Sequence, residues 1–438
     1  MDNITHSVVG LGIGALIDRS VAPETSPDDQ RVRTRLLLVL GCLASNFPDL
    51  DLVLTHLLAP PLGYLLHHRG HTHTLLGACG EIVVLLGLVW LLWPAARRLL
   101  RTSGRARGAA VVTAGVGTVL HIAMDGLNVY GVHPFWPFDP SWYYGDLVFI
   151  VEPVFWIAFG VPLAALVRGR TTRGLLLALL AAVSISVTAA GFLQWGSLAG
   201  LLALGLPLAW IARRVDGPRG RAAPGAGLAA SLAFVGIQAV ALHEARAITA
   251  AAVVRLDPHD RVLDTALSAY PANPLCWSFV TVAVDAAHGD YHLRRGQLSV
   301  APAITPVAHC PAPIAGRAVG TDARLAWQAE ERDDLARLRG LQATNCHFNA
   351  WMRFARAPSV GATTATDARW SPPGGRNFST IDHAALAAAP CPQPVPSWAY
   401  PRADLLTAPR ASAAAAAAHR LSGAHAGSAA LPSTFQKN

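Results

Sequence analysis

The feature that most constrains the fold of this 438-residue chain is a series of eight apolar runs separated by loops of contrasting charge. The chain is 52% hydrophobic and only 14% charged, whereas a soluble domain carries roughly 25% charged residues. Five runs, the third to sixth and the eighth, approach the ~20 residues needed to cross a bilayer. The sequence therefore predicts a mainly α protein built on a polytopic transmembrane helical bundle. The runs lie at about residues 4–17, 36–46, 75–93, 109–125, 147–167, 174–193, 196–212 and 228–245.

Arginine alternates between the loops. The loops after the first, third, fifth and seventh runs each contain three to five arginines, while the loops between them contain almost none except Arg69. The positive-inside rule puts the basic loops in the cytoplasm. The amino terminus and everything after the eighth run then lie outside, and we expect a multi-pass protein of the bacterial inner (cytoplasmic) membrane. No basic helix interleaved with aromatic residues is present, which argues against a nucleic-acid partner.

The pattern changes after about residue 252. Residues 277–284 have strand composition, residues 288–290 resemble a turn, and residues 291–300 are typical of the returning strand. Residues 322–340 are charged and helical in pattern, and residues 349–356 indicate another short ordered element. These features predict a small α+β domain after the bundle, on its extracytoplasmic side.

We therefore divide the chain into a transmembrane helical domain (1–252), an extracytoplasmic α+β domain (253–400) and a tail (401–438). The tail is rich in alanine, proline and serine, which predicts disorder. Four cysteines fall in the exported domain, where oxidising conditions permit disulfides. Their three pairings remain open, as does the alternative of unpaired buried thiols. They are Cys276, Cys310, Cys346 and Cys391.

The densest group of functional side chains is the stretch 67–73, with four histidines and an arginine directly before the third apolar run. Neutral imidazole is the commonest protein metal ligand, and ionisable groups at a membrane boundary indicate function. Further candidates share the predicted outer side, and we expect these patches to converge at one end of the bundle. They are His6, Asp49, Asp51, the i,i+4 pair His121 and Asp125, and Asp146 and Glu152 at the start of the fifth run.

Histidine and carboxylate ligands without thiolates favour a divalent metal, zinc first, with manganese or iron as alternatives. This many side chains can also hold a pair of ions. Arg69 suits a contact to a substrate oxyanion or phosphate. Glu81, two turns beyond His73, is a candidate ligand, general base or carboxylate that orients a histidine. The predicted metal ligands are His6, Asp49, Asp51, His68, His73, His121 and Asp125.

Each patch also has a structural interpretation. His6 and the tandem histidines suit the headgroup layer, the two aspartates after the second run can cap a helix, and His121 can bond Asp125 within its helix. The aromatic loop 128–138 is typical of an interfacial anchor, and it can also roof a site. The clustering of the patches on one predicted side favours the metal interpretation.

Four pieces of the chain, in order, resemble the YdjM-like family of membrane-bound, metal-dependent hydrolases. They are Met1 to His6 before an apolar run, Pro48-Asp49-Leu50-Asp51, His68-Arg69-Gly70 with Thr72-His73, and His121 with Asp125 followed by Asn128-Val129-Tyr130-Gly131. This resemblance covers about residues 1–160, and residues 271–277 and 351–354 are similar to the extra domain of longer members. The chain departs from the family pattern at His71 and Thr74, which leaves His67 and His71 outside the ligand set.

The function that follows is a membrane-bound metal-dependent hydrolase at the outer membrane boundary. Its expected substrate is an ester or phosphodiester of a lipid or envelope component, and a divalent metal can activate water for such a reaction. One alternative is a non-enzymatic membrane protein that binds, senses or transports a divalent metal. Transport is disfavoured because the last three runs offer few polar groups beyond Gln194 and Gln238. A further alternative is an envelope scaffold with a structural metal.

Overall fold

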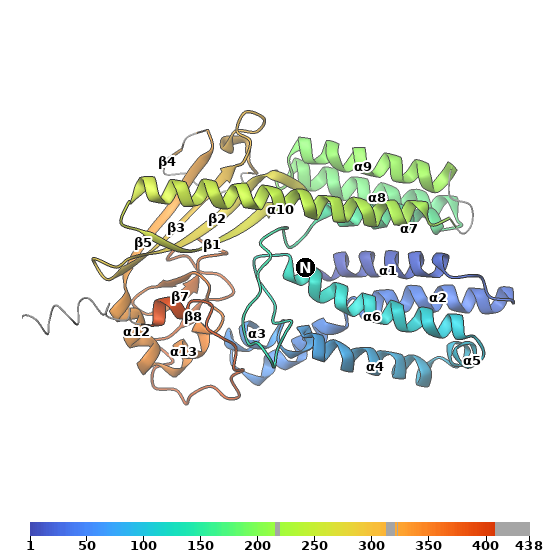
Figure 1. The fold of residues 1–438 in the computed structure, drawn as a ribbon, viewed down its shortest axis with the longest axis horizontal. Helices are drawn as coiled ribbons and strands as arrows, with labels where there is room; N and C mark the ends of the chain where they lie inside the picture. The colour runs from blue at the N-terminus through green and yellow to red at the C-terminus, as the bar shows by residue number, and fades with distance from the viewer. Residues whose placement is uncertain (215–219, 312–319, 322, 408–438) are drawn as a thin grey trace, which may run out of the picture.

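The computed structural model describes residues 1–214, 220–311, 320–321 and 323–407. A bundle of long helices occupies one end of the elongated molecule and antiparallel sheets occupy the other (Figure 1). The mainly α fold with a carboxyl-terminal sheet region is confirmed. The helices of the first 256 residues are α1 (Asn3–Ser20), α2 (Pro27–Ala44), α3 (Leu62–His67), α4 (Leu75–Leu92), α5 (Pro94–Thr102), α6 (Gly104–Gly126), α7 (Pro153–Leu166), α8 (Arg170–Ala189), α9 (Trp195–Arg214) and α10 (Ala222–Leu256), with 3-10 segments η1 (Phe47–Leu57) and η2 (His71–His73).

Six helical segments in the described part of the chain are long and apolar enough to cross a membrane. The fifth predicted span is shorter than expected, because α7 has only 14 residues. It begins at Pro153, where the side chain of Glu152 accepts the Val154 N–H at 3.2 Å and so caps the helix. The residues before it, 127–152, form a long loop instead. The six segments are Pro27–Leu57, which joins α2 to η1, and α4, α6, α8, α9 and α10.

Glycines allow α1 and α2 to pack with their backbones in contact. A Cβ built on Gly10 would lie 2.2 Å from the carbonyl oxygen of Gly41, and one built on Gly14 would lie 2.2 Å from that of Leu37. Close approach through small residues is the usual way in which membrane helices associate. It brings the start of α1 against the end of α2, where the candidate ligands begin.

The five-stranded antiparallel sheet has the order β1-β2-β3-β5-β4, and a three-stranded sheet has the order β6-β7-β8. Helix α10 continues from the bundle across the larger sheet (Figure 1), and its Ala245 and Ala252 share a hydrophobic cluster with Leu267, Trp277 and Phe279 of the strands. The elements are β1 (Arg261–Tyr270), β2 (Asn273–Asp285), β3 (Asp290–Ser299), η3 (Val307–His309), β4 (Gly320–Thr321), β5 (Leu325–Asp334), α12 (Leu335–Thr344), α13 (Cys346–Met352), β6 (Pro358–Val360), β7 (Thr364–Asp367), β8 (Ile381–Asp382) and α14 (Ala403–Leu406).

The prediction of one helix over residues 322–340 is wrong for most of its length. Residues 325–334 form β5, which pairs with β3, and α12 starts only at Leu335, where Asp334 accepts the Arg337 N–H at 2.9 Å. The five consecutive charged residues from Glu330 to Asp334 alternate between exposed and half-buried positions, as in a strand, so pairing with a long neighbouring strand outweighs the local helical pattern. The other short element, expected at 349–356, is α13 at 346–352. Residue 322 lies outside the described residues.

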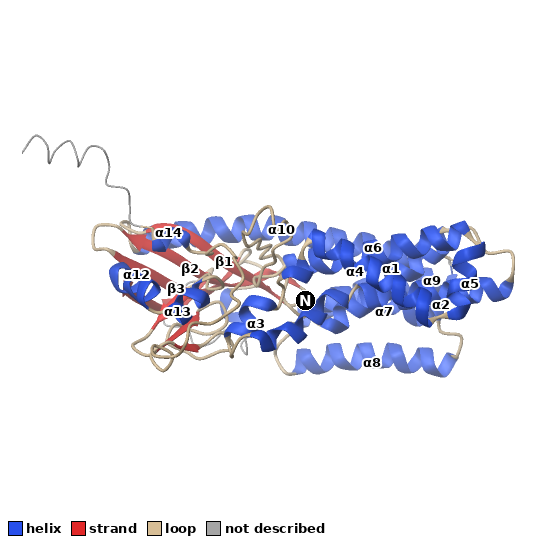
Figure 2. Cartoon of the chain, turned by 90° about the horizontal axis from the view of Figure 1, so that it is seen from below, coloured by secondary structure: helices blue, strands red, loops and turns tan. Residues whose placement is uncertain are grey.

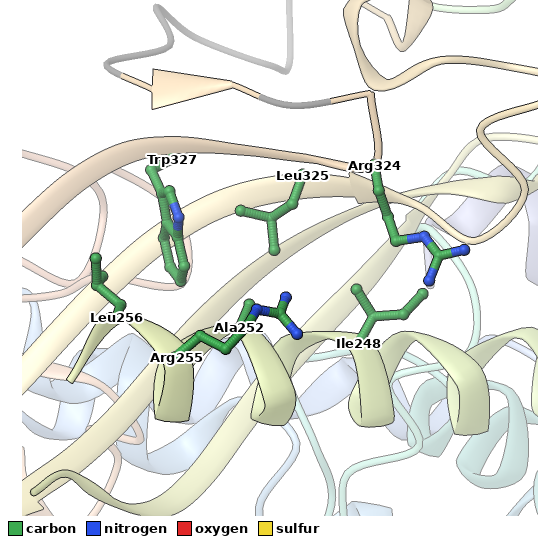
Figure 3. Close-up of a pocket in the computed structure, with 7 residues that line it drawn as sticks. All are labelled: Ile248, Ala252, Arg255, Leu256, Arg324, Leu325 and Trp327. Atoms are coloured by element: carbon green, nitrogen blue, oxygen red, sulfur yellow. The ribbon is translucent and has the colours of Figure 1, made fainter. Parts of the chain in front are cut away.

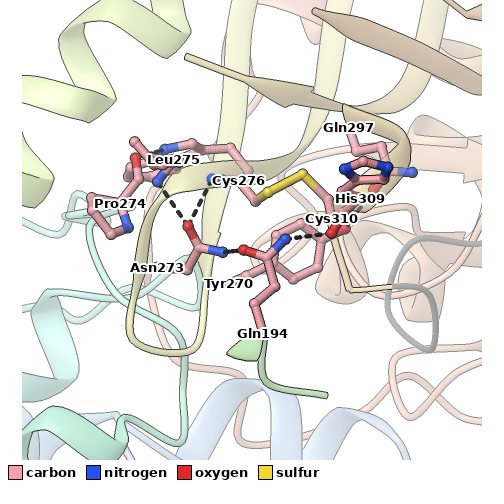
Figure 4. The surroundings of a disulfide bond; sticks show 10 residues. Gln194, Tyr270, Asn273, Pro274, Leu275, Cys276, Gln297, His309 and Cys310 are labelled. Atoms are coloured by element: carbon pink, nitrogen blue, oxygen red, sulfur yellow. Dashed lines mark hydrogen bonds between the residues drawn. A yellow bond between two sulfur atoms is a disulfide. The ribbon is translucent and has the colours of Figure 1, made fainter. Parts of the chain in front are cut away.

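Two disulfides join the predicted cysteines. Cys276 of β2 bonds Cys310 after η3, and Cys346 of α13 bonds Cys391. Beside the first bond, the amide of Asn273 donates to Gln194 at 2.7 Å, which ties the start of α9 to the β1–β2 turn (Figure 4). The tail is ordered further than predicted, because α14 buries Leu405. The remaining predicted tail, from residue 408, lies outside the described residues.

The carboxyl-terminal region packs on the loops at the near end of the bundle (Figure 2). The indole of Trp398 donates to the carbonyl of Leu66 at 2.8 Å, and that of Trp142 donates to the carbonyl of Arg353 at 2.7 Å. Both indoles are buried, and a buried Trp N–H normally finds a partner. These contacts hold α3 and the 127–152 loop, the two segments that flank the candidate site.

Candidate metal centre

The predicted ligands meet at the end of the bundle that faces the sheets, where α1 begins and α6 ends (Figure 1). After α2 ends, η1 turns Asp49 and Asp51 inward, and these side chains are buried. The stretch 68–74 follows the short α3 and joins α4, whose first turn is capped when Thr74 accepts the Gly77 N–H at 2.8 Å. Segments that are distant in the sequence thus present side chains to one small volume.

Four donor atoms form the centre of the cluster. The Nε2 atoms of His73 and His121 are 3.1 Å apart. Each lies 3.5 Å from Asp49 Oδ1, and they lie 3.2 and 3.7 Å from Asp125 Oδ2. All four atoms lie within 4.8 Å of one another. Ligands about 2.0–2.2 Å from a tetrahedral zinc ion would be ~3.3–3.6 Å apart, so the spacing matches that of a small coordination shell.

The opposite ring nitrogens hold the two imidazoles in orientation. His121 Nδ1 lies 2.7 Å from the carbonyl oxygen of Ser45, which can only accept, so this nitrogen carries the proton. His73 Nδ1 lies 3.1 Å from Asp51 Oδ2. Such partners leave each Nε2 lone pair directed at the shared volume, the arrangement found around metal-bound histidines.

His6 and His68 flank this centre without belonging to the group of four atoms. The ring of His6 stacks on His121 with centroids 3.9 Å apart, and its Nε2 lies 3.2 Å from Asp125 Oδ1. The α-amino group of Met1 also contacts that oxygen. His68 Nδ1 lies 3.1 Å from Asp51 Oδ1, and His68 forms a second group of potential ligands with Asp49 and Asp51. Burial lowers the pKa of His68, opposed by its bond to Asp51.

Arg69 is buried beside the ligands. Its Nε lies 2.9 Å from Asp125 Oδ2, and its Nη1 donates to Asn128 Oδ1 at 3.0 Å. The guanidinium carbon sits 4.6 Å from the ring centroid of Tyr130, in cation–π geometry. The backbone of Arg69 is in the left-handed region (φ 58°). The guanidinium therefore neutralises part of the carboxylate charge and fixes Asp125.

Three predicted carboxylates lie apart from the four atoms. Glu81 is buried in α4, and neither of its oxygens has a hydrogen-bond partner among the described residues. Asp146 and Glu152 lie in the segment that meets the amino terminus, where the Asp2 N–H donates to the Ile150 carbonyl at 3.2 Å, but their partners are other groups than the four atoms. Asp146 pairs with Arg356 at 2.7 and 2.8 Å, and Glu152 accepts the Ala272 N–H at 3.0 Å. Burial raises the pKa of Glu152 to about 8.

Sequence reasoning missed the groups that position the ligands. The amide of Asn3 donates to Asp49 Oδ2 at 2.8 Å, and the hydroxyl of Thr72 donates to Asp51 Oδ2 at 2.9 Å. The carbonyl of Ser45 and the side chain of Asn128 complete the set. Asn3, Thr72 and Asn128 all fall within the family-like motifs, so the motifs held a signal for them. A backbone carbonyl has no such signal.

The remaining histidines of this region serve as packing groups. His71 lies against Trp136 and Trp398, with ring centroids 4.5 and 4.9 Å away. His133 stacks on Trp398 at 3.9 Å, and burial lowers its pKa to about 3. The aromatic loop 128–138 thus covers the histidine stretch together with the carboxyl-terminal region.

A third group of potential ligands and one cavity lie elsewhere. Asp257, Asp260 and His292 approach one another in the sheet region, but the guanidinium of Arg294 sits among them and pairs with both aspartates. This group is therefore an ion-pair network. A cavity of ≈ 230 Å³ lies between α10 and β5 (Figure 3), and it has no histidine or carboxylate in its lining: Ile248, Ala252, Arg255, Leu256, Arg324, Leu325 and Trp327.

Comparison with known proteins assigns the amino-terminal part. The model of the YdjM inner membrane protein family matches residues 1–195. Over 158 residues the chain is 26% identical to the uncharacterized protein YfhP of Bacillus subtilis (strain 168). The aligned stretch covers 36% of this chain and 44% of YfhP, so the chain spans less than half of that relative's length. No solved structure matches the chain. The segment that carries every member of the candidate metal cluster, residues 1–195, therefore matches the YdjM inner membrane protein family.

Proposed function

We propose that this membrane protein is a metal-dependent hydrolase whose ion is held by His73, His121, Asp49 and Asp125. The observation that carries the proposal is the mutual spacing of four donor atoms, of which five separations lie between 3.1 and 3.7 Å. A cation between these atoms would be bound by two facing imidazole nitrogens and two carboxylates. Asp125 Oδ2 meets no hydrogen-bond donor in good geometry in the described structure, and Arg69 Nε lies 2.9 Å from it as an ion-pair partner. The residues therefore fit a divalent ion, with zinc first and manganese or iron as alternatives.

A bound divalent ion supplies Lewis acidity and lowers the pKa of water, which is the chemistry that hydrolysis needs. The protein contributes the geometry. Ser45 and Asp51 fix the tautomers of the two histidines, and Asn3 fixes Asp49. Arg69 adds a buried positive charge beside the ligands, where it can stabilise negative charge that develops on a substrate. Glu81 stays a candidate base, although it has no contact with the four atoms.

The surface around η1 supports a lipid-like substrate. Four aliphatic side chains of η1 are 42 to 71% exposed. The same eleven-residue segment contains the buried Asp49 and Asp51. Exposed apolar patches of this kind mark membrane or ligand contact. A lipid ester or phosphodiester in the adjacent headgroup layer is therefore the substrate class that we propose. The four side chains are Leu50, Leu52, Val53 and Leu57.

We also propose that the cluster and residues 253–400 face the extracytoplasmic side. The arginines in the last turn of α1, in the first half of α2 and in α5 lie at the far end of the bundle from the sheets (Figure 1). The positive-inside rule assigns that end to the cytoplasm. A reporter fused after Gly104 should read as cytoplasmic and one after Arg255 as exported, and the reverse result would overturn this orientation.

The decisive experiment is metal analysis of the detergent-purified full chain beside a His73→Ala/His121→Ala variant. We expect bound metal in the wild type and its loss in the variant, together with loss of turnover of lipid phosphoesters in mixed micelles. His71→Ala is the matched control, because that imidazole packs on Trp398 outside the cluster. An equal metal content per chain in the wild type and the double variant would refute the proposal.

One observation favours a second candidate, a structural metal in an envelope scaffold. His73, His121 and Asp125 are fully buried, as closed structural sites usually are. Metal that is bound, lost in the double variant and accompanied by no hydrolysis of phosphoesters or carboxylic esters would favour this function. Retained folding of the metal-free protein would argue against it, because structural metals contribute folding free energy directly.

A further inference from the structure

We infer that the cluster holds a second divalent ion beside the first, at a position formed by Asp49, Asp51 and His68. This inference rests on the proposed function, because Asp49 is shared with the first position. Seven predicted ligands are too many for one tetrahedral ion. The structure places six of them in two groups that share Asp49, and His6 belongs to neither group. The second group offers one donor atom from each of its three residues, all within 4.8 Å of one another.

The two oxygens of Asp51 face different neighbours. Oδ2 lies 3.1 Å from His73 Nδ1 and accepts from Thr72 at 2.9 Å. Oδ1 lies 3.1 Å from His68 Nδ1, which is about the separation of two ligands on one small ion. One carboxylate therefore both orients a histidine of the first position and supplies an oxygen to the second.

Asp49 is the bridge between the positions. Its Oδ1 lies 3.5 Å from each Nε2 of the first position, while its Oδ2 accepts from Asn3 at 2.8 Å. Paired catalytic ions are about 3.5–4 Å apart and clamp the attacking and leaving oxygens of a phosphoryl group. A carboxylate that belongs to both ligand groups is consistent with such a separation.

The second position is also the more open one. The side chain of His68 is 11% exposed, whereas those of His73 and His121 are 0% exposed. The ring of Tyr64 borders it, with its centroid 4.9 Å from that of His68, and Phe378 packs on Tyr64 at 5.8 Å between centroids. With only three protein ligands, this ion would keep coordination positions for water and substrate. The substrate class it favours is a phosphodiester or phosphomonoester rather than a carboxylic ester.

The test counts ions. The full chain is purified in detergent, stripped with a chelator, dialysed against Mn²⁺ and analysed for metal per chain, with electron paramagnetic resonance on the same samples. We expect two Mn²⁺ per wild-type chain with an exchange-coupled spectrum, and one isolated Mn²⁺ in His68→Gln. Glutamine keeps a donor for Asp51, so this variant should fold. His71→Ala is the histidine control and should keep both ions.

Each result has a distinct meaning. One Mn²⁺ in wild type and in His68→Gln would overturn the second position and leave the proposed function intact. Two Mn²⁺ in both would overturn the assignment to His68. No Mn²⁺ in the wild type, with Zn²⁺ also failing to bind, would overturn the proposed function together with this inference.

Discussion

The buried ion pair between Arg356 and Asp146 offers the sharpest test of how the carboxyl-terminal region supports the site. Arg356, after α13, contacts both oxygens of Asp146 at 2.7 and 2.8 Å, and it also contacts Asp264 of β1 at 2.7 Å. Its guanidinium lies 4.1 Å from the ring centroid of Tyr144. The pair therefore connects the sheet region with the 127–152 loop, which carries Asn128 and Tyr130 to Arg69.

Replacing Arg356 with methionine keeps much of the side-chain volume but leaves two carboxylates near each other. Breaking a buried pair in this way costs about 3–5 kcal/mol. We expect the lower end, because Arg246 lies 3.3 Å from Asp146 and Arg402 lies 3.2 Å from Asp264. Since 1 kcal/mol shifts the midpoint of a 150–250-residue unit by about 2–4 °C, Tm should fall by at least about 6 °C.

The assay is thermal unfolding in detergent followed by near-ultraviolet circular dichroism, with limited proteolysis of the 127–152 loop as a second readout. Arg332→Met is the matched control, because Arg332 is 57% exposed and its ion pairs should contribute under about 1 kcal/mol. A Tm for Arg356→Met equal to that of the control, with an unchanged protease pattern, would refute the reasoning. The Arg356→Met/Asp146→Asn double variant should recover part of the loss in Tm, since it removes one buried carboxylate charge that lacks its partner.

Four further outcomes follow from single contacts. Asn3→Ala should weaken metal binding about 10–100-fold, as loss of a ligand's hydrogen-bond partner does. Competition with a chromophoric chelator measures this affinity, and an unchanged value would show that Asn3 does not position Asp49. Burial raises the pKa of Glu152 from 4.5 to about 8, so its contribution to stability is complete below about pH 4.5 and lost as pH rises through 8. Wild-type Tm should therefore drop between pH 6 and 9 more than that of Glu152→Gln, and parallel curves would contradict this. The Glu81→Gln variant should still bind metal but lose hydrolytic activity. Full activity would exclude Glu81 as the general base. Gly10→Leu should prevent folding, because its Cβ meets the Gly41 carbonyl at 2.2 Å; a normal yield of monodisperse protein would show that α1 can move away.

The clustering of most of the candidate ligands was predictable because each of them lies next to the end of an apolar run. That position is visible in sequence, and the alternation of arginine shows which ends share a side. The same rule gave no sign of the partners of Asp146 and Glu152. Both start the fifth run, but their partners are Arg356 and the backbone of Ala272, more than a hundred residues away.

Two elements of the fold also differ from the prediction. Residues 325–334 carry a helical charge pattern, yet they form β5 because β3 offers a full-length partner. The fifth run is apolar over about twenty residues, yet Pro153 and the carboxylate of Glu152 start α7 late. In β5 a local preference of a few tenths of a kcal/mol per residue gives way to pairing with a distant strand, whereas neighbouring residues set the start of α7.

The sequence by itself determined that the chain forms an apolar helical bundle, that a different kind of domain follows it, and that His6, Asp49, His73, His121 and Asp125 share one end. Run length, composition and residue order carry these properties, so no tertiary information is needed. Only the tertiary structure decided which donor atoms face each other and how the ligands divide into two groups. Those separations depend on the packing of α1 on α2, on the Ser45 carbonyl behind His121 and on both oxygens of Asp51. Coordination is sensitive to tenths of an ångström, and such differences arise only when distant segments pack together.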